Sequence, residues 1–419
     1  MAAGRDNVPL MTSPQCGQSR ADRVTVVGIG ADGWPSLSEE ARAVLTEASA
    51  IAGSPRQLAL LPDLTARRVP LPSPLLEHID QLVRDYPGLC VLASGDPTLH
   101  GIGATLTRRL GATAVRIFPA VSSVALACAR LGWPQQEITV VSLMSQRPEA
   151  TLAAMQPGAR LIVLCPDRRT PPVVARVLTD RGWGASELTV LEALGGPAER
   201  VSLPQQAAEL TGDALADLCV LAVTARQEPG AVAGRTPGLP DSAYETDGQI
   251  TRRELRALAL AALRPGPRAL LWDVGAGSGS VGIEWMRADP LARAVAIEAR
   301  TDRAERVGRN AAALGVPALR VIIGTAPAVL AGLPDPDAVF IGGGLTTDGV
   351  FSACWQRLPP GGRLVAHAVT IESETLLQSW QQERGGELVK VAVSYREPLG
   401  KFTAWRPALP VTQWQVTRP

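Results

Sequence analysis

With 419 residues, the chain has the length of two or three domains, and its 46% hydrophobic and 19% charged residues are ordinary for a soluble globular protein. The net charge of +1 argues against a nucleic-acid partner, and no apolar run approaches the roughly 18 residues of a membrane-spanning helix, which argues against a membrane partner. The six cysteines are dispersed and the three histidines stand apart, so neither a metal site nor a disulfide framework is expected.

Alternating strand and helix patterns predict the first domain. Residues 1–20 lack an apolar signal core and are expected to form a flexible tail of a cytoplasmic protein. Helices are predicted in stretches that begin with polar or small residues and continue with helix formers, such as residues 38–48 and 101–111. The alternation predicts an α/β domain with largely parallel sheets over residues 21–228. Its strands are predicted from short β-branched apolar runs at 24–30, 89–94, 114–119, 137–143, 159–165, 187–194 and 218–223.

The pattern stops in a stretch dense in glycine and proline, which predicts a linker over residues 229–240. A second α/β series then predicts another domain over residues 241–419. It begins with a helix at 251–263. Strands are predicted at 269–275, 292–299, 319–324, 336–344, 361–369 and 387–394.

The second domain contains the glycine cluster WDVGAGSGSVG, residues 272–282. The predicted strand ends at Asp273, and a helix follows the glycines. Glu298 ends the next predicted strand, where a carboxylate can accept hydrogen bonds from both hydroxyls of a ribose. Gly277, Gly279 and Gly282 also satisfy the G-x-G-x-x-G pattern of a nicotinamide dinucleotide site. The whole stretch nevertheless resembles the D-x-G-x-G-x-G motif of class I S-adenosylmethionine (SAM) methyltransferases. The aspartate fits that pattern and would repel a pyrophosphate.

The first domain opens with VTVVGIGADG, residues 24–33, which also contains a G-x-G-x-x-G pattern. A dinucleotide site needs an acidic residue near residue 50, and the strand there, ASAIAGSPRQ, has none. Pro35 also stands where the crossover helix should begin. The stretch instead resembles the first strand and loop of the tetrapyrrole methylase family. The match continues with LASGDPTLHGIG (92–103), FPAVSSV (118–124) and VVSL (140–143).

These resemblances imply an N-terminal fold of two α/β subdomains with SAM between them, followed by a Rossmann-like class I methyltransferase domain. They also imply two SAM sites, one in each domain. The N-terminal SAM site would include Gly95, Asp96, Ile102, Gly103, Ser122, Ser123 and Leu143, with Gly28 and Gly30 near the acceptor. The C-terminal SAM site would include Thr251, Asp273, Gly275, Gly277, Gly279, Glu298, Thr325 and Ala326.

The order of the two folds resembles the fused precorrin methyltransferases of cobalamin biosynthesis. That family implies methylation of a precorrin at C5 by the first domain. It implies methylation at C15 and loss of the C12 acetate carboxyl by the second domain. The reactions of the two domains together would convert precorrin-6Y to precorrin-8X. His367, Glu372 and His100 are the candidate acid–base residues, although a buried structural histidine explains His367 equally well. Assembly of a homo-oligomer through the second domain is also implied. A nicotinamide-dependent reductase remains the alternative.

Overall fold

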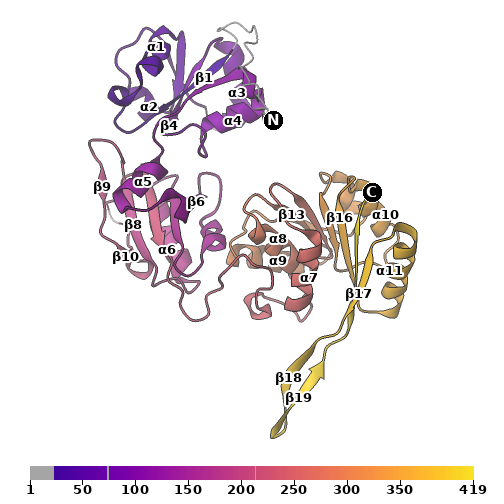
Figure 1. The fold of residues 1–419 in the computed structure, drawn as a ribbon. Helices are drawn as coiled ribbons and strands as arrows, with labels where there is room; N and C mark the ends of the chain where they lie inside the picture. The colour runs from indigo at the N-terminus through magenta and orange to yellow at the C-terminus, as the bar shows by residue number, and fades with distance from the viewer. Residues whose placement is uncertain (1–22, 73–74, 213) are drawn as a thin grey trace, which may run out of the picture. The chain divides into compact units, whose positions relative to one another are not determined.

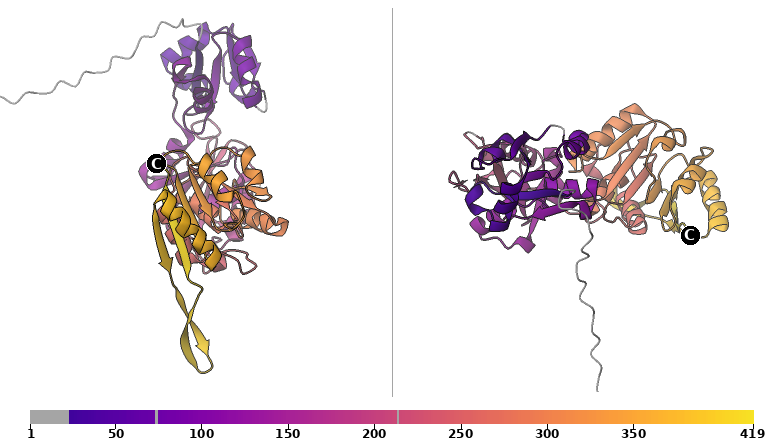
Figure 2. Two further views of the ribbon diagram at one scale, coloured as in Figure 1. Left: turned by 90° about the vertical axis from the view of Figure 1, so that its right-hand side faces the viewer. Right: turned by 90° about the horizontal axis from the view of Figure 1, so that it is seen from above.

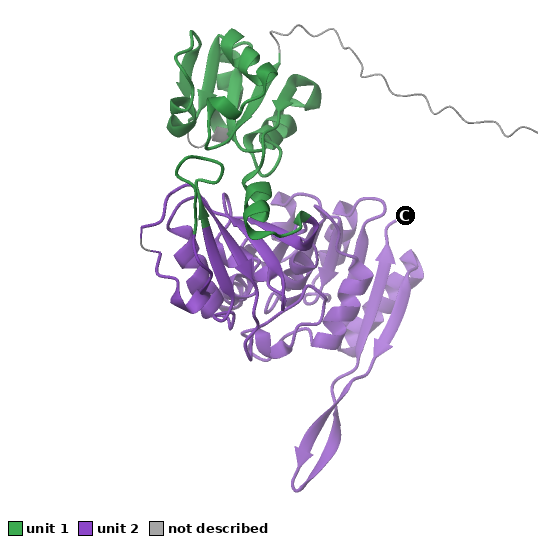
Figure 3. Cartoon of the chain, turned by 60° about the vertical axis from the view of Figure 1, so that its left-hand side comes forward, with its two compact units in different colours: residues 1–135, 191–201 green, residues 136–190, 202–419 purple. Residues whose placement is uncertain are grey.

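The computed structural model describes residues 23–72, 75–212 and 214–419, so the expected tail over residues 1–20 lies outside the described residues (Figure 1). The predicted α/β class is confirmed, and the predicted strands are present with ends that differ by a few residues. Two compact units share the chain. One comprises residues 1–135 and 191–201 and the other residues 136–190 and 202–419 (Figure 3). Within the described ranges, no helix has both the length and the hydropathy needed to cross a membrane.

The first unit contains a five-stranded parallel sheet in the order β3-β2-β4-β1-β5. Its interior strand β1 is buried over most of its length, because valine and isoleucine side chains fit a sheet covered on both faces. The strands are β1 (Val24–Ile29), β2 (Ala50–Gly53), β3 (Arg67–Pro70), β4 (Cys90–Ser94) and β5 (Val115–Phe118). The helices are α1 (Glu39–Glu47), α2 (Pro55–Ala59), α3 (Leu75–Asp85), α4 (Ile102–Leu110) and α5 (Ser123–Leu131).

A six-stranded sheet has the order β10-β8-β11-β7-β6, with β9 paired to β8. It belongs to the second unit except for β9 and the last two residues of β8, which are part of the first unit. The strands β6 and β7 run parallel, whereas β7 and β11 run antiparallel. The strands are β6 (Ile138–Ser142), β7 (Arg160–Leu164), β8 (Glu187–Glu192), β9 (Arg200–Val201), β10 (Gln205–Gln206) and β11 (Cys219–Thr224), and α6 (Thr170–Thr179) packs beside them.

A seven-stranded sheet in the order β14-β13-β12-β15-β16-β20-β17 forms the rest of the second unit. From β12, the chain builds outward first through β13 and β14 and then, on the other side, through β15 and β16. The strand order therefore reverses between β12 and β15, and ligands of open parallel sheets bind at such a point. The parallel strands are β12 (Leu270–Val274), β13 (Arg293–Glu298), β14 (Arg320–Ile323), β15 (Ala338–Ile341) and β16 (Arg363–Ala368). The helices are α7 (Arg253–Leu263), α8 (Ser280–Ala288), α9 (Thr301–Ala313), α10 (Val350–Arg357) and α11 (Ile371–Arg384).

A hairpin leaves this sheet near the C-terminal end of the chain, and the sequence did not predict it. It joins β17 (Glu387–Val391) to β20 (Val411–Thr417), which lies antiparallel between β16 and β17. The hairpin strands are β18 (Ser394–Leu399) and β19 (Phe402–Pro407), and they extend past the end of the sheet (Figure 2). Because β19 is exposed along its whole length, it lacks the alternation of buried and exposed side chains by which a strand is recognised.

Candidate active site

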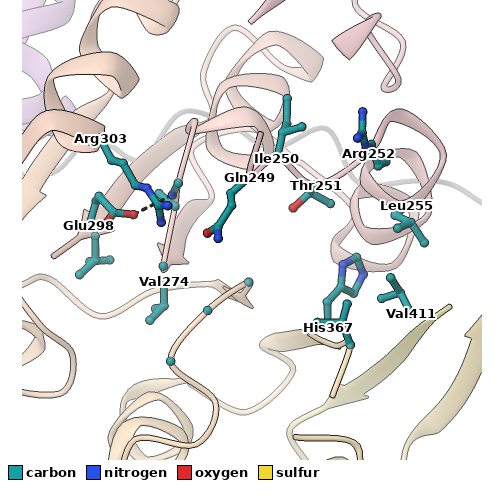
Figure 4. A pocket seen from close by; sticks show the side chains of 18 of the residues that line it. Gln249, Ile250, Thr251, Arg252, Leu255, Val274, Glu298, Arg303, His367 and Val411 are labelled. Atoms are coloured by element: carbon teal, nitrogen blue, oxygen red, sulfur yellow. Dashed lines mark hydrogen bonds between the residues drawn. The ribbon is translucent and has the colours of Figure 1, made fainter. Parts of the chain in front are cut away.

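A cavity of about 870 Å³ lies at the carboxyl ends of the strands where the order of the seven-stranded sheet reverses. Loops that follow β12, β13, β14 and β15 line it. Figure 4 shows Glu298 and Arg303 at one end of the cavity, His367 and Val411 at the other, and Gln249 and Thr251 between them. The sequence-predicted residues that line the cavity are Thr251, Gly275, Gly277, Glu298, Thr325, Ala326 and His367.

Gly275 and Gly277 form the floor of the cavity, and both have a φ in the left-handed region that favours glycine. Gly275 has a φ of 74°, and a Cβ on it would lie 2.7 Å from both the N and Cα atoms of Gly343. Gly277, with a φ of 60°, has its nearest neighbour, the carbonyl oxygen of Gln249, 3.5 Å from where a Cβ would be. The backbone can therefore approach a ligand closely, in front of the N-terminus of α8.

Glu298 ends β13 with its side chain 5% exposed, at the edge of the cavity. Its Oε2 accepts a hydrogen bond from the N–H of Gly277 at 2.9 Å, and its Oε1 accepts one from the N–H of Arg300 at 3.0 Å. These two bonds fix the carboxylate and leave each oxygen able to accept again. The arrangement suits the two adjacent hydroxyls of a ribose.

Asp273 does not line the cavity, although it ends the strand that leads into it. Its side chain is 1% exposed, and its Oδ2 accepts a hydrogen bond from the N–H of Gly282 at 2.9 Å. Burial raises the pKa of Asp273 to about 7, and the nearby Glu298 charge adds to the rise, whereas the Gly282 bond lowers it. In this structure the carboxyl ties the end of β12 to the first turn of α8. Gly279, at the N-cap of α8, likewise lies outside the cavity lining.

The raised pKa predicts how replacement of Asp273 by asparagine changes stability with pH. The carboxyl of the folded chain holds its proton up to about pH 7, whereas that of the unfolded chain loses it near pH 3.8. The contribution of Asp273 to the free energy of unfolding is therefore full below pH 3.8 and is lost as the pH rises through 7. Relative to Asp273→Asn, the parent chain should lose about 1.4 kcal/mol of stability per pH unit between pH 5 and pH 7. Thermal unfolding of both proteins at the two pH values measures this. An Asp348→Asn variant at an exposed site controls for the charge change, and parallel pH curves for parent and Asp273→Asn would contradict the prediction.

A segment that precedes α7, residues 248–252, covers the glycine loop, and Thr251 is its only residue in the SAM site predicted from the sequence. Gln249 and Ile250 also line the cavity. Asp247, just before the segment, accepts a hydrogen bond from Arg303 Nε at 2.8 Å. The hydrogen bonds from Arg303 and from the N–H of Gln249 help lower the pKa of Asp247 to about 2. This ion pair holds the segment over α9, a contact between residues 56 positions apart that no local pattern indicates.

The other end of the cavity is mostly apolar and lies at the base of the β18–β19 hairpin. His367, at the end of β16, lines it and is 9% exposed. Burial lowers the pKa of His367, which keeps the ring neutral at neutral pH. Glu372 is exposed in the first turn of α11 and does not line the cavity. The apolar lining comes from Val369, Val391, Val393, Ala408, Leu409 and Val411, with Tyr395 beside them.

In the first unit, the predicted residues that follow β4 form a tight loop. Gly95 has a φ of 58°, and Asp96 Oδ1 accepts hydrogen bonds from the N–H and hydroxyl of Thr98 at 2.8 and 2.7 Å. A Cβ on Gly103, in the first turn of α4, would lie 2.7 Å from the Cβ of Pro97. His100 is exposed in this loop with a φ of 52°, and Ile102 begins α4.

The other predicted residues of the first domain lie in two different units. Ser122 is the N-cap of α5 and accepts a hydrogen bond from the N–H of Ala125 at 3.0 Å, and Ser123 is the first residue of that helix. A Cβ on Gly28 would lie 2.3 Å from the carbonyl oxygen of Gly95, so β1 and the loop after β4 touch backbone to backbone in the first unit. Leu143 follows β6 in the second unit and is buried.

Comparisons with known proteins match two family models to separate stretches of the chain, and the first stretch includes residues of both compact units. A model of the Tetrapyrrole (Corrin/Porphyrin) Methylases matches residues 23–210, and one described as Precorrin methyltransferase domain matches residues 242–418. A "Precorrin-6Y C(5,15)-methyltransferase [decarboxylating]" from Sinorhizobium is 45% identical over the full length of both chains.

Two shorter relatives each match less than half of the chain. A "Cobalt-precorrin-7 C(5)-methyltransferase" from Salmonella typhimurium is 31% identical over 42% of this chain and 88% of its own. A "Probable cobalt-precorrin-6B C(15)-methyltransferase (decarboxylating)" from Pyrobaculum calidifontis is 35% identical over 42% of this chain and 93% of its own. These names give no support to a nicotinamide-dependent reductase. Since the Sinorhizobium relative matches from end to end, the chain belongs to the precorrin-6Y C(5,15)-methyltransferase (decarboxylating) family.

Proposed function

We propose that the chain methylates a precorrin twice in cobalamin biosynthesis, with one SAM site in each domain. The first domain (residues 21–228) would methylate C5, and the second (residues 241–419) would methylate C15 and remove the C12 acetate carboxyl, so that precorrin-6Y becomes precorrin-8X. The two single-function relatives named for C5 and C15 support the division. The observation that carries the proposal is the glycine floor beside Glu298, open to a large apolar cavity.

In the second domain, the residues suit SAM at one end of the cavity and the macrocycle at the other. Gly275 and Gly277 let the backbone approach the methionine part, and Glu298 accepts from the ribose hydroxyls. Thr325 and Ala326 would face the adenine. The apolar residues at the base of the hairpin would receive the ring. When bound, SAM supplies an electrophilic methyl group.

In methyl transfer, the chain's own task is to align the methyl donor with the acceptor carbon and to exclude water from the site. The meso carbons of a reduced tetrapyrrole are enamine-like nucleophiles, so no Ser-His-Asp type triad is required. Gly275, Gly277 and Glu298 would hold SAM, and the apolar half of the cavity would hold the macrocycle that receives its methyl group at C15. For decarboxylation, the C–CO₂ bond breaks, its electron pair enters the ring π-system, and the former acetate CH₂ carbon takes up a proton to become a methyl group. Apolar walls favour this step because they strip water from the carboxylate.

His367 is the side chain that we assign to proton handling at this site. It is buried and neutral, and it lines the apolar half of the cavity. A neutral imidazole offers one nitrogen as a proton acceptor. Glu372 and His100 remain proposals of the same kind, without a cavity position that supports them.

In the first domain, we assign SAM binding to the loop after β4 and the turn before α5. Gly95, Asp96, Ile102, Gly103, Ser122 and Ser123 belong to these two loops, and Leu143 follows β6. The close approach of the two loops supports the assignment, because a Cβ on Gly95 would lie 3.2 Å from the carbonyl oxygen of Val121 and 3.3 Å from Cα of Ser122.

The test is incubation of the full chain with the reduced precorrin substrate and SAM, followed by mass measurement of the product. We expect a gain of two methyl groups and loss of one CO₂. Calorimetric titration should find two S-adenosylhomocysteine sites per chain, whereas binding of NADPH alone would refute the proposal. Asp96→Asn and Glu298→Gln variants, measured separately, would show whether each domain contributes one methyl.

We also propose that the second domain assembles the protein into a homo-oligomer through the β18–β19 hairpin. Leu399, Phe402 and Trp405 on the hairpin are 65%, 79% and 72% exposed, which is costly for an arm surrounded by water. A Phe402→Ser/Trp405→Ser variant should therefore have a lower mass by light scattering than the parent. Leu203→Ser, at an 82% exposed position elsewhere, should leave the mass unchanged. A parent chain that is monomeric at all concentrations would contradict the proposal.

A further inference from the structure

A row of hydrogen-bonded side chains connects His367 to the edge of the seven-stranded sheet. His367 Nε2 lies 2.8 Å from Gln413 Oε1, Gln413 Nε2 donates to Gln415 Oε1 at 3.0 Å, and Gln415 Nε2 donates to Glu387 Oε2 at 2.7 Å. The strand register explains the row. His367 pairs directly with Gln413 across β16 and β20, and Glu387 pairs directly with Gln415 across β17 and β20. Because Gln413 and Gln415 are two residues apart on one strand, their side chains share one face.

The Glu387 carboxylate at the end of the row determines which group donates and which accepts in each hydrogen bond. Ionised Glu387 can only accept hydrogen bonds, so Gln415 must turn its NH₂ group toward it and its carbonyl oxygen toward Gln413. Gln413 must then donate to Gln415, which leaves its carbonyl oxygen to face the histidine. A ring nitrogen that meets a carbonyl oxygen has to carry the proton. The opposite direction would place the Gln415 oxygen against the Glu387 carboxylate.

We infer that Glu387, Gln415 and Gln413 are positioning residues that fix the tautomer of His367, with the proton on Nε2 and the lone pair on Nδ1. Phe340, whose ring lies edge-on to the imidazole with 5.0 Å between centroids, restricts the rotation of the ring. The described residues provide no hydrogen-bond partner for Nδ1, and His367 lines the cavity. Nδ1 is therefore the proton acceptor offered to the ligand.

The use of this acceptor rests on the proposed function. In the second domain, Nδ1 would accept a proton from the macrocycle as C15 is methylated, and the imidazolium would return that proton to the former acetate CH₂ carbon when CO₂ leaves. The wrong tautomer would instead present an N–H group to the ring and could accept nothing. The row thus selects a proton acceptor from a residue type that can be either donor or acceptor.

Nitrogen-15 NMR of the full chain, labelled at histidine, tests the tautomer without activity. The chain has only three histidines, so a His367→Gln variant assigns the resonances. We expect Nε2 of His367 to be protonated at neutral pH in the parent. A Gln413→Leu variant should lose this preference. Glu387→Gln should reduce the tautomer ratio by about fivefold, the size of one hydrogen bond's net contribution. The matched control Glu383→Gln, at an exposed position on α11, should leave the spectrum unchanged.

The enzymatic activity gives a second readout, because a purely structural role of Gln413 would not change kcat selectively. Gln413→Leu should lower kcat for C15 methylation and CO₂ loss on the order of 100-fold, as for loss of general base catalysis, with little change in KM and with C5 methylation retained. A parent with the proton on Nδ1 would overturn the inference, and so would a Glu387→Gln variant whose tautomer ratio is unchanged. If the tautomer is as stated but the parent methylates no precorrin, the proposed function fails and the tautomer assignment stands.

Discussion

Replacement of Gly275 by alanine should abolish cofactor binding in the second domain while leaving the first domain active. The left-handed φ of 74° costs an L-residue about 1–2 kcal/mol. The larger effect is steric, because the new Cβ would lie 2.7 Å from backbone atoms of Gly343 in the loop after β15. Neither loop can yield without moving the strand to which it belongs. The floor of the cavity would then be displaced, and with it the Gly277 N–H that holds Glu298.

The measurement combines calorimetry with product mass. We expect the Gly275→Ala protein to bind one S-adenosylhomocysteine instead of two, and its product to lack one methyl group and to keep its carboxyl. Gly308→Ala is the matched control in the same domain, since a Cβ at this position of α9 meets nothing within 4 Å. It should bind and react like the parent and gain up to about 1 kcal/mol in stability. Unchanged binding stoichiometry in Gly275→Ala would show that the cofactor lies elsewhere.

Replacement of Arg256 by methionine should destabilise the second domain by about 3–5 kcal/mol, because it leaves a buried carboxylate without its cation. Arg256 is 0% exposed, and its Nε donates to Glu284 Oε1 at 2.6 Å. Glu284 also accepts from the N–H groups of Gly238 and Leu239 and from the hydroxyl of Tyr244. Burial raises the pKa of Tyr244, which keeps this hydroxyl protonated.

The same arginine connects this network to the cavity. Its Nη1 donates to the carbonyl oxygen of Thr251 at 2.6 Å, so it holds the segment over residues 248–252 in place. We therefore expect weaker S-adenosylhomocysteine binding in the second domain together with a thermal midpoint lower by about 10 °C. Arg309→Met, which breaks an exposed ion pair with Glu245 at 2.9 Å, is the control and should cost no more than about 1 kcal/mol. Equal midpoints for the two variants would refute a structural role for the buried network.

Local sequence was sufficient for the elements and for part of the cavity. Apolar runs predicted the strands because buried parallel strands need continuous β-branched segments, as in β1 and β12. The glycine loop and Glu298 were predicted together because adjacent parallel strands end at one edge of a sheet. The family followed from the order of motifs, and the full-length relative confirms it.

Only the tertiary structure decided what surrounds those residues. Asp273 bonds to Gly282 instead of facing the cavity, and the segment at residues 248–252 reaches the site through Arg303 and Arg256. The hydrogen-bonded row from Glu387 to His367 exists because β20 inserts antiparallel between β16 and β17. Strand insertion and buried ion pairs depend on contacts between residues far apart in the chain, and the free energies of those contacts are set by packing that a local pattern does not encode.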